Sequence, residues 1–310
     1  MTALLVFLNI KLYFKYPVPI FAPVRGMSLG LQVCPCCVPP VAIGLATASL
    51  CIVATARLLL GESRGFASRA LRLLSYVLGA VVLVAAVGLA ALASNGPLRA
   101  RAFAKLCESL AKEPAMLPPR CERLGLGSAL AGRAVVEFGP GPGTNFACLD
   151  AANAPSRWTG VEPNRHFEAA QAAAAAHVSF PRETAWLKGE DVDVPAGSFD
   201  VAVLTHVLCS VDDPEAVLRQ AARALRPGGE LLVMEHVAAD DGTATRLAQR
   251  AFAPVFEIVG NGCKFRRTAD AIRAVAPGLF EGLDIDEFLA PVPIPFLRPH
   301  IIAKATRAAS

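Results

Sequence analysis

An acidic residue and three glycines at alternate positions form the most informative segment of this 310-residue chain. The segment that starts at Val135 contains Val-Val-Glu-Phe-Gly-Pro-Gly-Pro-Gly, in which Glu137 is followed by Gly139, Gly141 and Gly143. Glycine lets a backbone turn tightly and approach a ligand without a Cβ clash, so this spacing is typical of a nucleotide-cofactor loop. Dinucleotide loops place their third glycine one residue later. The observed spacing therefore favours S-adenosylmethionine, whose carboxylate and amino groups need backbone partners.

A second acidic residue stands at the distance expected for a ribose contact. Residues 157–161 are expected to form a buried strand that ends at Glu162, and an acid about 20 residues after such a loop binds ribose hydroxyls. Pro163 follows where a helix is expected to start, and the alanine-rich residues 164–177 favour that helix. Glu162 and Pro163 are therefore predicted cofactor contacts. A solvent-exposed acid at a strand end is the alternative for Glu162.

Further cofactor contacts are predicted where two later strands end. Glu190 or Asp191, after the third expected strand, is a candidate to accept a hydrogen bond from the adenine amino group. An exposed loop acid is an equal alternative for both. Thr205 and His206 follow the fourth expected strand and are also predicted to contact the cofactor.

Alternating strands and helices are needed to position these residues. Buried strands are expected at residues 134–138, 157–161, 184–187, 199–204 and 230–235. A helix is expected from Asp213-Pro214 to Leu225, where Arg-Pro-Gly-Gly stops it. This alternation predicts an α/β fold with a mostly parallel sheet, helices on both faces, and a ligand at the carboxyl ends of the strands.

Several of these segments together resemble the class I S-adenosylmethionine-dependent methyltransferases. They are Val-Val-Glu-Phe-Gly-Pro-Gly-Pro-Gly, Val-Glu-Pro-Asn (161–164), Gly-Ser-Phe-Asp (197–200) and Leu-Arg-Pro-Gly-Gly (225–229). Val-Leu-Cys-Ser-Val (207–211), Met-Glu-His-Val-Ala-Ala (234–239), Gly-Cys (262–263) and Arg-Pro-His (298–300) are similar to the membrane-anchored alkyl-thiol S-methyltransferases of the methyltransferase-like family. The resemblance covers about residues 101–305. It implies a Rossmann-like, mostly parallel seven-stranded sheet, S-adenosylmethionine as cofactor, and a small apolar acceptor, most of all an alkyl or aryl thiol.

The chain departs from the pattern of that family at three places. The family usually has Gly-Cys-Gly-Thr-Gly at 139–143, Asp at the position of Glu162, and an apolar residue at the position of His206. The two prolines of the loop remove N–H donors, so the cofactor carboxylate must find amides such as those of Gly141 and Gly143. Two alternatives stay open: a lipid or quinone methyltransferase that acts on oxygen, nitrogen or carbon, and a non-catalytic membrane-surface scaffold that keeps the fold.

Transfer of a methyl group to a thiol requires a thiolate, because the free thiol has a pKa of about 8.5. His206 and His236 follow the fourth and fifth expected strands, and both are candidates for the general base or for positioning the substrate. Packed strand-end histidines are the alternative. Cys209 is predicted to be a small buried residue, and His300 to be a structural residue of the terminal strand.

Composition divides the chain into two parts. The chain is 54% hydrophobic and 18% charged, with a mean hydropathy of +0.46, which is too apolar for one ordinary soluble domain. The excess lies in two uncharged runs, residues 38–56 and 73–93, each close to the ~20 residues that span a bilayer. Buried core helices are the alternative. We therefore expect a membrane-anchor region over residues 1–96 and a class I methyltransferase domain over residues 97–310.

Charge follows the same division and bears on partners and location. Residues 1–113 carry 11 Lys/Arg against 3 acids, a net charge of +8, so residues 114–310 carry −4 of the total of +4. Nucleic acid is not expected as a partner, because the catalytic part lacks a positive groove. Seven basic residues flank the two apolar runs and four lie between them, which favours a catalytic domain on the cytosolic side, at an endoplasmic reticulum or lipid-droplet-like membrane. No acid precedes Glu62, so an organellar targeting peptide is the alternative.

The nine cysteines are scattered and odd in number, which does not predict a disulfide framework. Those of the catalytic part are expected to stay reduced; they are Cys107, Cys121, Cys148, Cys209 and Cys263. Cys34, Cys36 and Cys37 form a group beside the first apolar run and are candidates for palmitoylation. No second pair accompanies them, so no metal site is expected.

Overall fold

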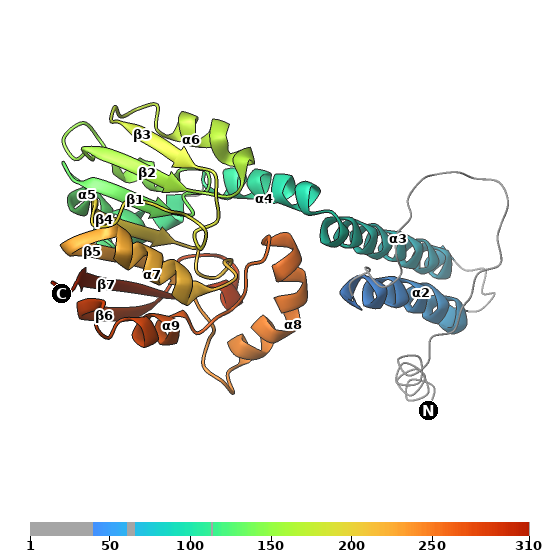
Figure 1. Ribbon diagram of the computed structural model, residues 1–310. Helices are drawn as coiled ribbons and strands as arrows, with labels where there is room; N and C mark the ends of the chain where they lie inside the picture. Colours follow the sequence, from blue (N-terminus) through green and yellow to red (C-terminus); the bar gives the residue numbers. More distant parts are fainter. Residues whose placement is uncertain (1–39, 61–65, 113, 310) are drawn as a thin grey trace. The chain divides into compact units, whose positions relative to one another are not determined.

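The computed structural model describes residues 40–60, 66–112 and 114–309 (Figure 1). The predicted palmitoylation group at residues 34–37 lies outside the described residues, and so do the first two residues of the predicted apolar run 38–56.

The catalytic part is built on one seven-stranded sheet with the order β3-β2-β1-β4-β5-β7-β6 (Figure 1). The first five strands of this order run parallel, and β7 lies antiparallel between β5 and β6. The strands are β1 (Ala134–Phe138), β2 (Arg157–Val161), β3 (Arg182–Ala185), β4 (Phe199–Thr205), β5 (Leu225–His236), β6 (Phe280–Leu289) and β7 (Pro299–Arg307). The strand order reverses between β1 and β4, and such a switch point is where sheets of this kind bind ligands. The predicted Rossmann-like sheet is confirmed.

Apolar side chains on the strands point alternately to the two faces of the sheet. Along β1, Val135 and Val136 belong to different buried clusters. The cluster of Val136 includes side chains of α7 (Pro214–Ala224) and α9 (Thr268–Val275), whereas the cluster of Val135 includes the 3-10 turn η4 (Thr144–Cys148). Because side chains alternate with a period of two, consecutive apolar residues supply a core on each face. The prediction of helices on both faces is confirmed.

Two predicted boundaries differ from the structure. The third strand occupies Arg182–Ala185 rather than residues 184–187, because it pairs with β2, which ends at Val161 opposite Ala185. The helix predicted over residues 164–177 is only α6 (Glu168–Ala174), preceded by the 3-10 turn η5 (Arg165–Phe167). The remaining helices and turns of the catalytic part are α4 (Gly96–Leu110), η2 (Pro114–Met116), η3 (Pro119–Arg123), α5 (Leu126–Ala129), α8 (Ala244–Val259) and η6 (Pro295–Leu297).

The predicted apolar runs form two helices, α2 (Pro40–Leu60) and α3 (Phe66–Ser94). They pack closely at Gly79: Ser49 Oγ donates a hydrogen bond to the Gly79 carbonyl at 2.6 Å, and a Cβ on Gly79 would lie 2.8 Å from Val53 Cγ2. Within the described residues, one helix is long and apolar enough to span a membrane, Ser68–Ser94, with a mean hydropathy of 2.5; the apolar stretch Ala42–Leu58 is shorter. Ser68–Ser94 is therefore the candidate anchor.

Cys121 and Cys148 form a disulfide, so the prediction that all cysteines of the catalytic part stay reduced is wrong. The turns η3 and η4 lie side by side and bring the two Cα atoms to 5.1 Å, although 27 residues separate them in sequence. The spacing of cysteines in a sequence does not show which pairs meet. Disulfides are typical of oxidising compartments, so this pair argues against the predicted cytosolic side.

Candidate functional site

The glycine loop after β1 turns as its sequence predicts. Gly139, Gly141 and Gly143 have φ angles of 63°, 54° and 81°, a region that favours glycine. A Cβ on Gly139 would lie 2.5 Å from Val207 Cγ2, and a Cβ on Gly143 would lie 2.9 Å from the Phe146 ring. A Cβ on Gly141 would meet no atom of the described residues within 4 Å. Gly139 and Gly143 therefore close the loop against the protein, while Gly141 leaves space for a ligand.

Glu162 joins this loop to the end of β2. Its Oε2 accepts a hydrogen bond from the Gly141 N–H at 3.1 Å, and its Oε1 accepts one from the Asn164 N–H at 2.9 Å. A carboxylate offers about four lone-pair sites, so two remain for the predicted ribose hydroxyls. Pro163 is exposed in the turn that follows. The amide of Gln171, which the sequence analysis missed, donates to the Gly141 carbonyl at 2.8 Å and supports the same loop.

Glu137 is buried at the end of β1 and belongs to a polar network. Its carboxylate accepts hydrogen bonds from Asn145 Nδ2 at 2.8 Å and from Trp158 Nε1 at 3.0 Å. Asn145 Nδ2 also donates to Thr205 Oγ1 at 2.9 Å, so Glu137 and Thr205 are linked through one amide. The sequence analysis did not identify Asn145, because an isolated amide carries no motif.

Both acids of the loop region have raised pKa values, and pH-dependent cofactor binding is the expected result. Burial raises the pKa of Glu137 and of Glu162 to about 7, against opposing hydrogen bonds. If the ionised form of Glu162 binds ribose, the ionised fraction of Glu162 is about one tenth at pH 6 and about nine tenths at pH 8. The affinity for S-adenosylmethionine should therefore rise about tenfold between these pH values. Isothermal titration at both pH values measures this rise, and Glu162→Gln should reduce it. A rise of equal size in that variant would contradict the role of Glu162.

The same shifts have the opposite sign for the stability of the cofactor-free protein. The folded pKa of each acid lies above its ordinary value of 4.5, so the folded protein binds more protons than the unfolded chain between about pH 4.5 and 7. The contribution of these two groups to the free energy of unfolding therefore falls as pH rises through that window.

Arg120 is a half-buried cation near the site that the sequence analysis missed. Burial lowers the pKa of Arg120, and the charge of Glu137 opposes this. Burial lowers the pKa of His206 and of His300, and the charge of Arg120 adds to this. Its Nε has no hydrogen-bond partner among the described residues. A guanidinium with an unmet donor is suited to the carboxylate of the cofactor's methionine.

Arg120→Met is expected to weaken S-adenosylmethionine binding about thirtyfold, or about 2 kcal/mol, the scale of a hydrogen bond to a charged group. The free energy of unfolding of the cofactor-free protein should change by less than this, because Arg120 is only half-buried and its Nε has no hydrogen-bond partner among the described residues. Titration calorimetry and urea unfolding measure the two effects. Arg123→Met is the matched control, since Arg123 lies in the same turn but pairs with exposed Asp286. Unchanged affinity in Arg120→Met would remove Arg120 from the site.

Glu190 and Asp191 follow β3 as predicted, but they differ in environment. Glu190 Oε1 accepts hydrogen bonds from the N–H groups of Asp212 and Asp213 at 2.8 and 3.3 Å, so it organises the turn before α7. Asp191 is exposed. The contact of either residue with adenine stays a prediction.

His206 and His300 form a hydrogen-bonded pair, with Nε2 atoms 3.0 Å apart. His300 Nδ1 lies 3.1 Å from the Arg298 carbonyl, which places a proton on Nδ1, so His206 Nε2 donates to His300 Nε2. Burial first, and then the neighbouring charges, hold the pKa of His206 well below its ordinary value, and burial lowers the pKa of His300 to about 4. His300, predicted to be a structural residue of the terminal strand, therefore pairs with His206 just beyond the end of β4. His206 is a weak proton acceptor for a thiol whose pKa is about 8.5.

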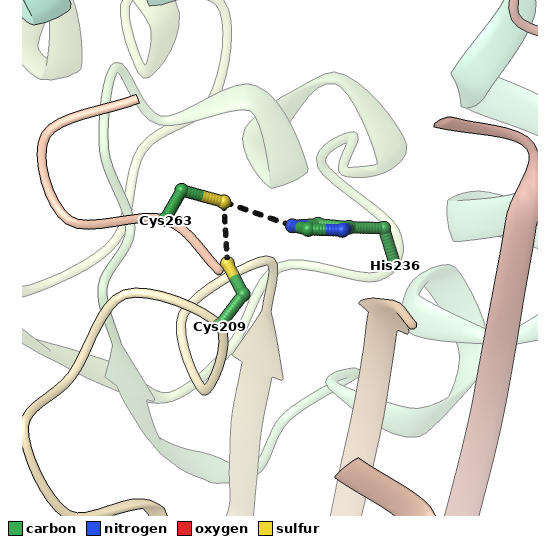
Figure 2. A group of neighbouring side chains, drawn as sticks. All are labelled: Cys209, His236 and Cys263. Carbon is green, nitrogen blue, oxygen red and sulfur yellow. Dashed lines mark hydrogen bonds between the residues drawn. The ribbon is translucent and has the colours of Figure 1, made fainter. Parts of the chain in front are cut away.

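His236, the other candidate base, ends β5 beside two cysteines (Figure 2). Its Nε2 lies 2.9 Å from Cys263 Sγ, which lies 3.2 Å from Cys209 Sγ. All three residues are buried. Cys209 is therefore a buried residue as predicted, but its contact with Cys263, 54 residues later in the chain, was not predicted.

Aromatic side chains also pack against His236. The rings of Phe256 and Phe265 stack 4.8 Å apart, and their centroids lie 5.8 and 5.5 Å from the His236 ring. Phe296 stacks on Phe252 at 4.9 Å and meets Phe265 edge to face at 6.1 Å. These four phenylalanines, called the aromatic cluster below, are half-buried or exposed. They form an apolar surface beside the histidine and the two thiols.

Known proteins match both the sequence and the fold. A sequence model described as a methyltransferase domain matches residues 99–274, more than half of the chain. Two Homo sapiens proteins, thiol S-methyltransferases TMT1A and TMT1B, are each 34% identical over 177 and 189 residues; these cover 56% and 59% of this chain and 70% and 74% of those proteins. The crystal structure of a possible exported protein from Bordetella parapertussis shares the fold, with a TM-score of 0.51 and 17% identity over 86% of this chain and 97% of that chain. With the glycine loop and Glu162 inside the matched segment, the chain belongs to the methyltransferase domain family and is an S-adenosylmethionine-dependent methyltransferase.

Proposed function

We propose that the protein transfers the methyl group of S-adenosylmethionine to the sulfur of a small apolar thiol. The observation that carries this proposal is the aromatic cluster beside His236, at the carboxyl end of the strand that neighbours β4. Half-exposed phenylalanines offer an alkyl or aryl group a surface to pack on. The names of the two human relatives, which are thiol S-methyltransferases, support the same acceptor.

The reaction is an in-line displacement in which the acceptor sulfur attacks the methyl carbon of the sulfonium. The bond from that carbon to the sulfonium sulfur breaks, and its electron pair stays with the departing S-adenosylhomocysteine. The protein chiefly supplies positioning. Glu162 and the glycine loop hold the cofactor, and the aromatic cluster orients the acceptor beyond the end of β4.

We further propose that Ser68–Ser94 anchors the enzyme in a membrane, as its length and mean hydropathy of 2.5 permit. An apolar acceptor that partitions into the bilayer would reach an anchored active site at a raised local concentration. More basic residues flank the two apolar runs than lie between them, which favours a catalytic domain on the cytosolic side. The disulfide instead favours the side with an oxidising environment. Protease protection of the catalytic part in sealed microsomes would decide between these sides.

The acceptor is tested by incubating the full chain in detergent micelles with methyl-labelled S-adenosylmethionine and a panel of alkyl and aryl thiols. Lipid and quinone extracts serve as competing acceptors, and Glu162→Ala is the inactive control. Label in the methyl thioether supports the proposal. Label in lipid or quinone would replace the thiol with those acceptors, and cofactor binding without any transfer would favour a scaffold.

A further inference from the structure

Cys209, His236 and Cys263 come from three separate segments and converge on one point (Figure 2). Their donor atoms, two sulfurs and one imidazole nitrogen, all lie within 4.8 Å of one another. A tetrahedral zinc ion bound to such atoms keeps them about 3.5 to 3.8 Å apart, as follows from bond lengths of about 2.3 Å to sulfur and 2.0 Å to nitrogen. The observed separations of 2.9 and 3.2 Å for two of the pairs fall short of this by less than an ångström. Small side-chain rotations are therefore enough to admit the ion.

Backbone hydrogen bonds hold the three segments together independently of any ligand. The Lys264 N–H donates to the Cys209 carbonyl at 2.9 Å, which joins the segments of the two cysteines. The Ala238 N–H donates to the Arg266 carbonyl at 2.8 Å, which joins the segments of His236 and Cys263. Glu235 Oε1 accepts the N–H groups of the turn before Cys209, those of Val207 and Leu208, each at 2.6 Å. The ligand set is thus preorganised by the fold.

Two polar atoms beside the thiols lack a partner. His236 Nδ1 and Glu235 Oε2 are buried, and neither has a hydrogen-bond partner among the described residues. Because His236 Nε2 is the nitrogen that faces Cys263, Nε2 would bind the ion, and Nδ1 would be left for an outer-shell partner such as water. Two thiolates, a neutral imidazole and a divalent cation together carry no net charge, which suits a buried position.

We propose that Cys209, His236 and Cys263 bind one zinc ion, and that the sulfur of the acceptor thiol occupies its fourth coordination position. Two cysteines and one histidine with an open fourth position are a ligand set of catalytic zinc sites. The zinc site stands on geometry alone. The role of the fourth position rests on the proposed function.

The location of the cluster fits that role. Val207, which lies between His206 and Cys209 in the chain, is the residue that packs against Gly139 of the cofactor loop. His236 in turn meets Phe256 and Phe265 of the aromatic cluster. An acceptor with its sulfur on zinc and its apolar body on the phenylalanines would lie between the cofactor and the aromatic surface.

Zinc would solve a chemical problem that the histidines leave open. His206 Nε2 is engaged in a hydrogen bond with His300 Nε2 at 3.0 Å, whereas a thiol that coordinates zinc loses its proton outright. The two cysteine thiols release their protons to solvent when the ion binds, and the acceptor thiol releases its own when it coordinates. The acceptor sulfur then forms a bond to the methyl carbon, the sulfonium bond breaks, and the neutral thioether leaves the metal with S-adenosylhomocysteine as the second product.

The first test measures metal in the full chain, purified in detergent with a non-thiol reductant and without chelators. Mass spectrometry of the metal content should give about one zinc per chain. Cys209→Ser and Cys263→Ser should each lower zinc affinity by more than the roughly 10- to 100-fold that loss of an outer-shell partner costs. Cys51→Ser, an exposed cysteine of α2, is the matched control and should keep the metal. S-adenosylmethionine binding in each variant shows that the catalytic part still folds.

The second test replaces zinc with cobalt(II) and follows its visible spectrum while a thiol from the panel is added. A new sulfur-to-cobalt charge-transfer band, absent with the matching alcohol, is expected, and removal of the metal should abolish thiol methylation. The zinc site would be overturned if both cysteine variants kept their zinc. It would also be overturned if Cys209 and Cys263 formed a disulfide in place of binding metal. Thiol methylation that survives metal removal would overturn the catalytic role and leave the proposed function intact. If zinc is bound but the thiol produces no charge-transfer band and is not methylated, the proposed function is wrong. The role of the fourth coordination position, which rests on it, is then wrong as well.

Discussion

Glu162→Ala is expected to weaken S-adenosylmethionine binding by ~2 to 4 kcal/mol, roughly 30- to 1,000-fold. The variant removes the acceptor for two ribose hydroxyls and also the two hydrogen bonds that Glu162 accepts from Gly141 and Asn164. Without the hydrogen bond from Gly141, the glycine loop is less firmly held. Cofactor binding is therefore weakened both by the lost ribose contact and by the looser loop. Isothermal titration with S-adenosylmethionine and S-adenosylhomocysteine measures the loss.

Glu162→Asp and Glu183→Ala are the controls for this result. Aspartate keeps the charge and should recover part of the affinity. Glu183 lies on the neighbouring strand β3 and accepts a hydrogen bond from Thr159, so its loss alters the sheet edge without reaching the loop. Unchanged affinity in Glu162→Ala would end the assignment of Glu162 to the ribose.

Removal of the disulfide by the double substitution Cys121→Ser and Cys148→Ser is expected to lower the free energy of unfolding by about 3.5 kcal/mol. The bond closes a loop with a sequence separation of 27 residues, and loop-closure entropy gives this magnitude. Arg120 adjoins Cys121, so a loosened η3 should also weaken cofactor binding. Urea unfolding and titration calorimetry measure the two effects.

The exposed Cys51 supplies the control for this prediction, because Cys51→Ser removes a thiol that is not in a disulfide. A strong reductant should destabilise the native sequence but leave the double variant unchanged. If the reductant has no effect on the native sequence, the bond between Cys121 and Cys148 does not form in solution.

The cofactor loop and the sheet were predictable because their signals are local in sequence. Gly139, Gly141 and Gly143 stand within five residues of one another, and the tight turn they form depends on their own backbone freedom. The strands were recognisable from short apolar runs, each of which must fill the core on both faces of a parallel sheet. Helix ends were less certain, since α6 is shorter than its alanine content suggests: packing, rather than propensity, decides where a short helix ends.

Which residues meet on the acceptor side of the site was not predictable, because they lie far apart in the chain. Arg120 precedes β1, His300 lies in β7, and Cys263 follows α8, yet all three reach the end of β4 or β5. The disulfide was not predictable either, because Cys121 and Cys148 are distant in sequence, and both were expected to be free thiols.

The sequence by itself determined the family, the cofactor, the glycine loop and the position of the apolar helices. These depend on residues close together in the chain, where spacing fixes geometry. Only the tertiary structure decided that His206 pairs with His300, that Cys209 meets Cys263 and His236, and that the charge of Arg120 acts on Glu137. The physical reason is that the carboxyl ends of parallel strands meet at one edge of a sheet, so the order of strands in space, and not their order in sequence, decides which side chains share a site.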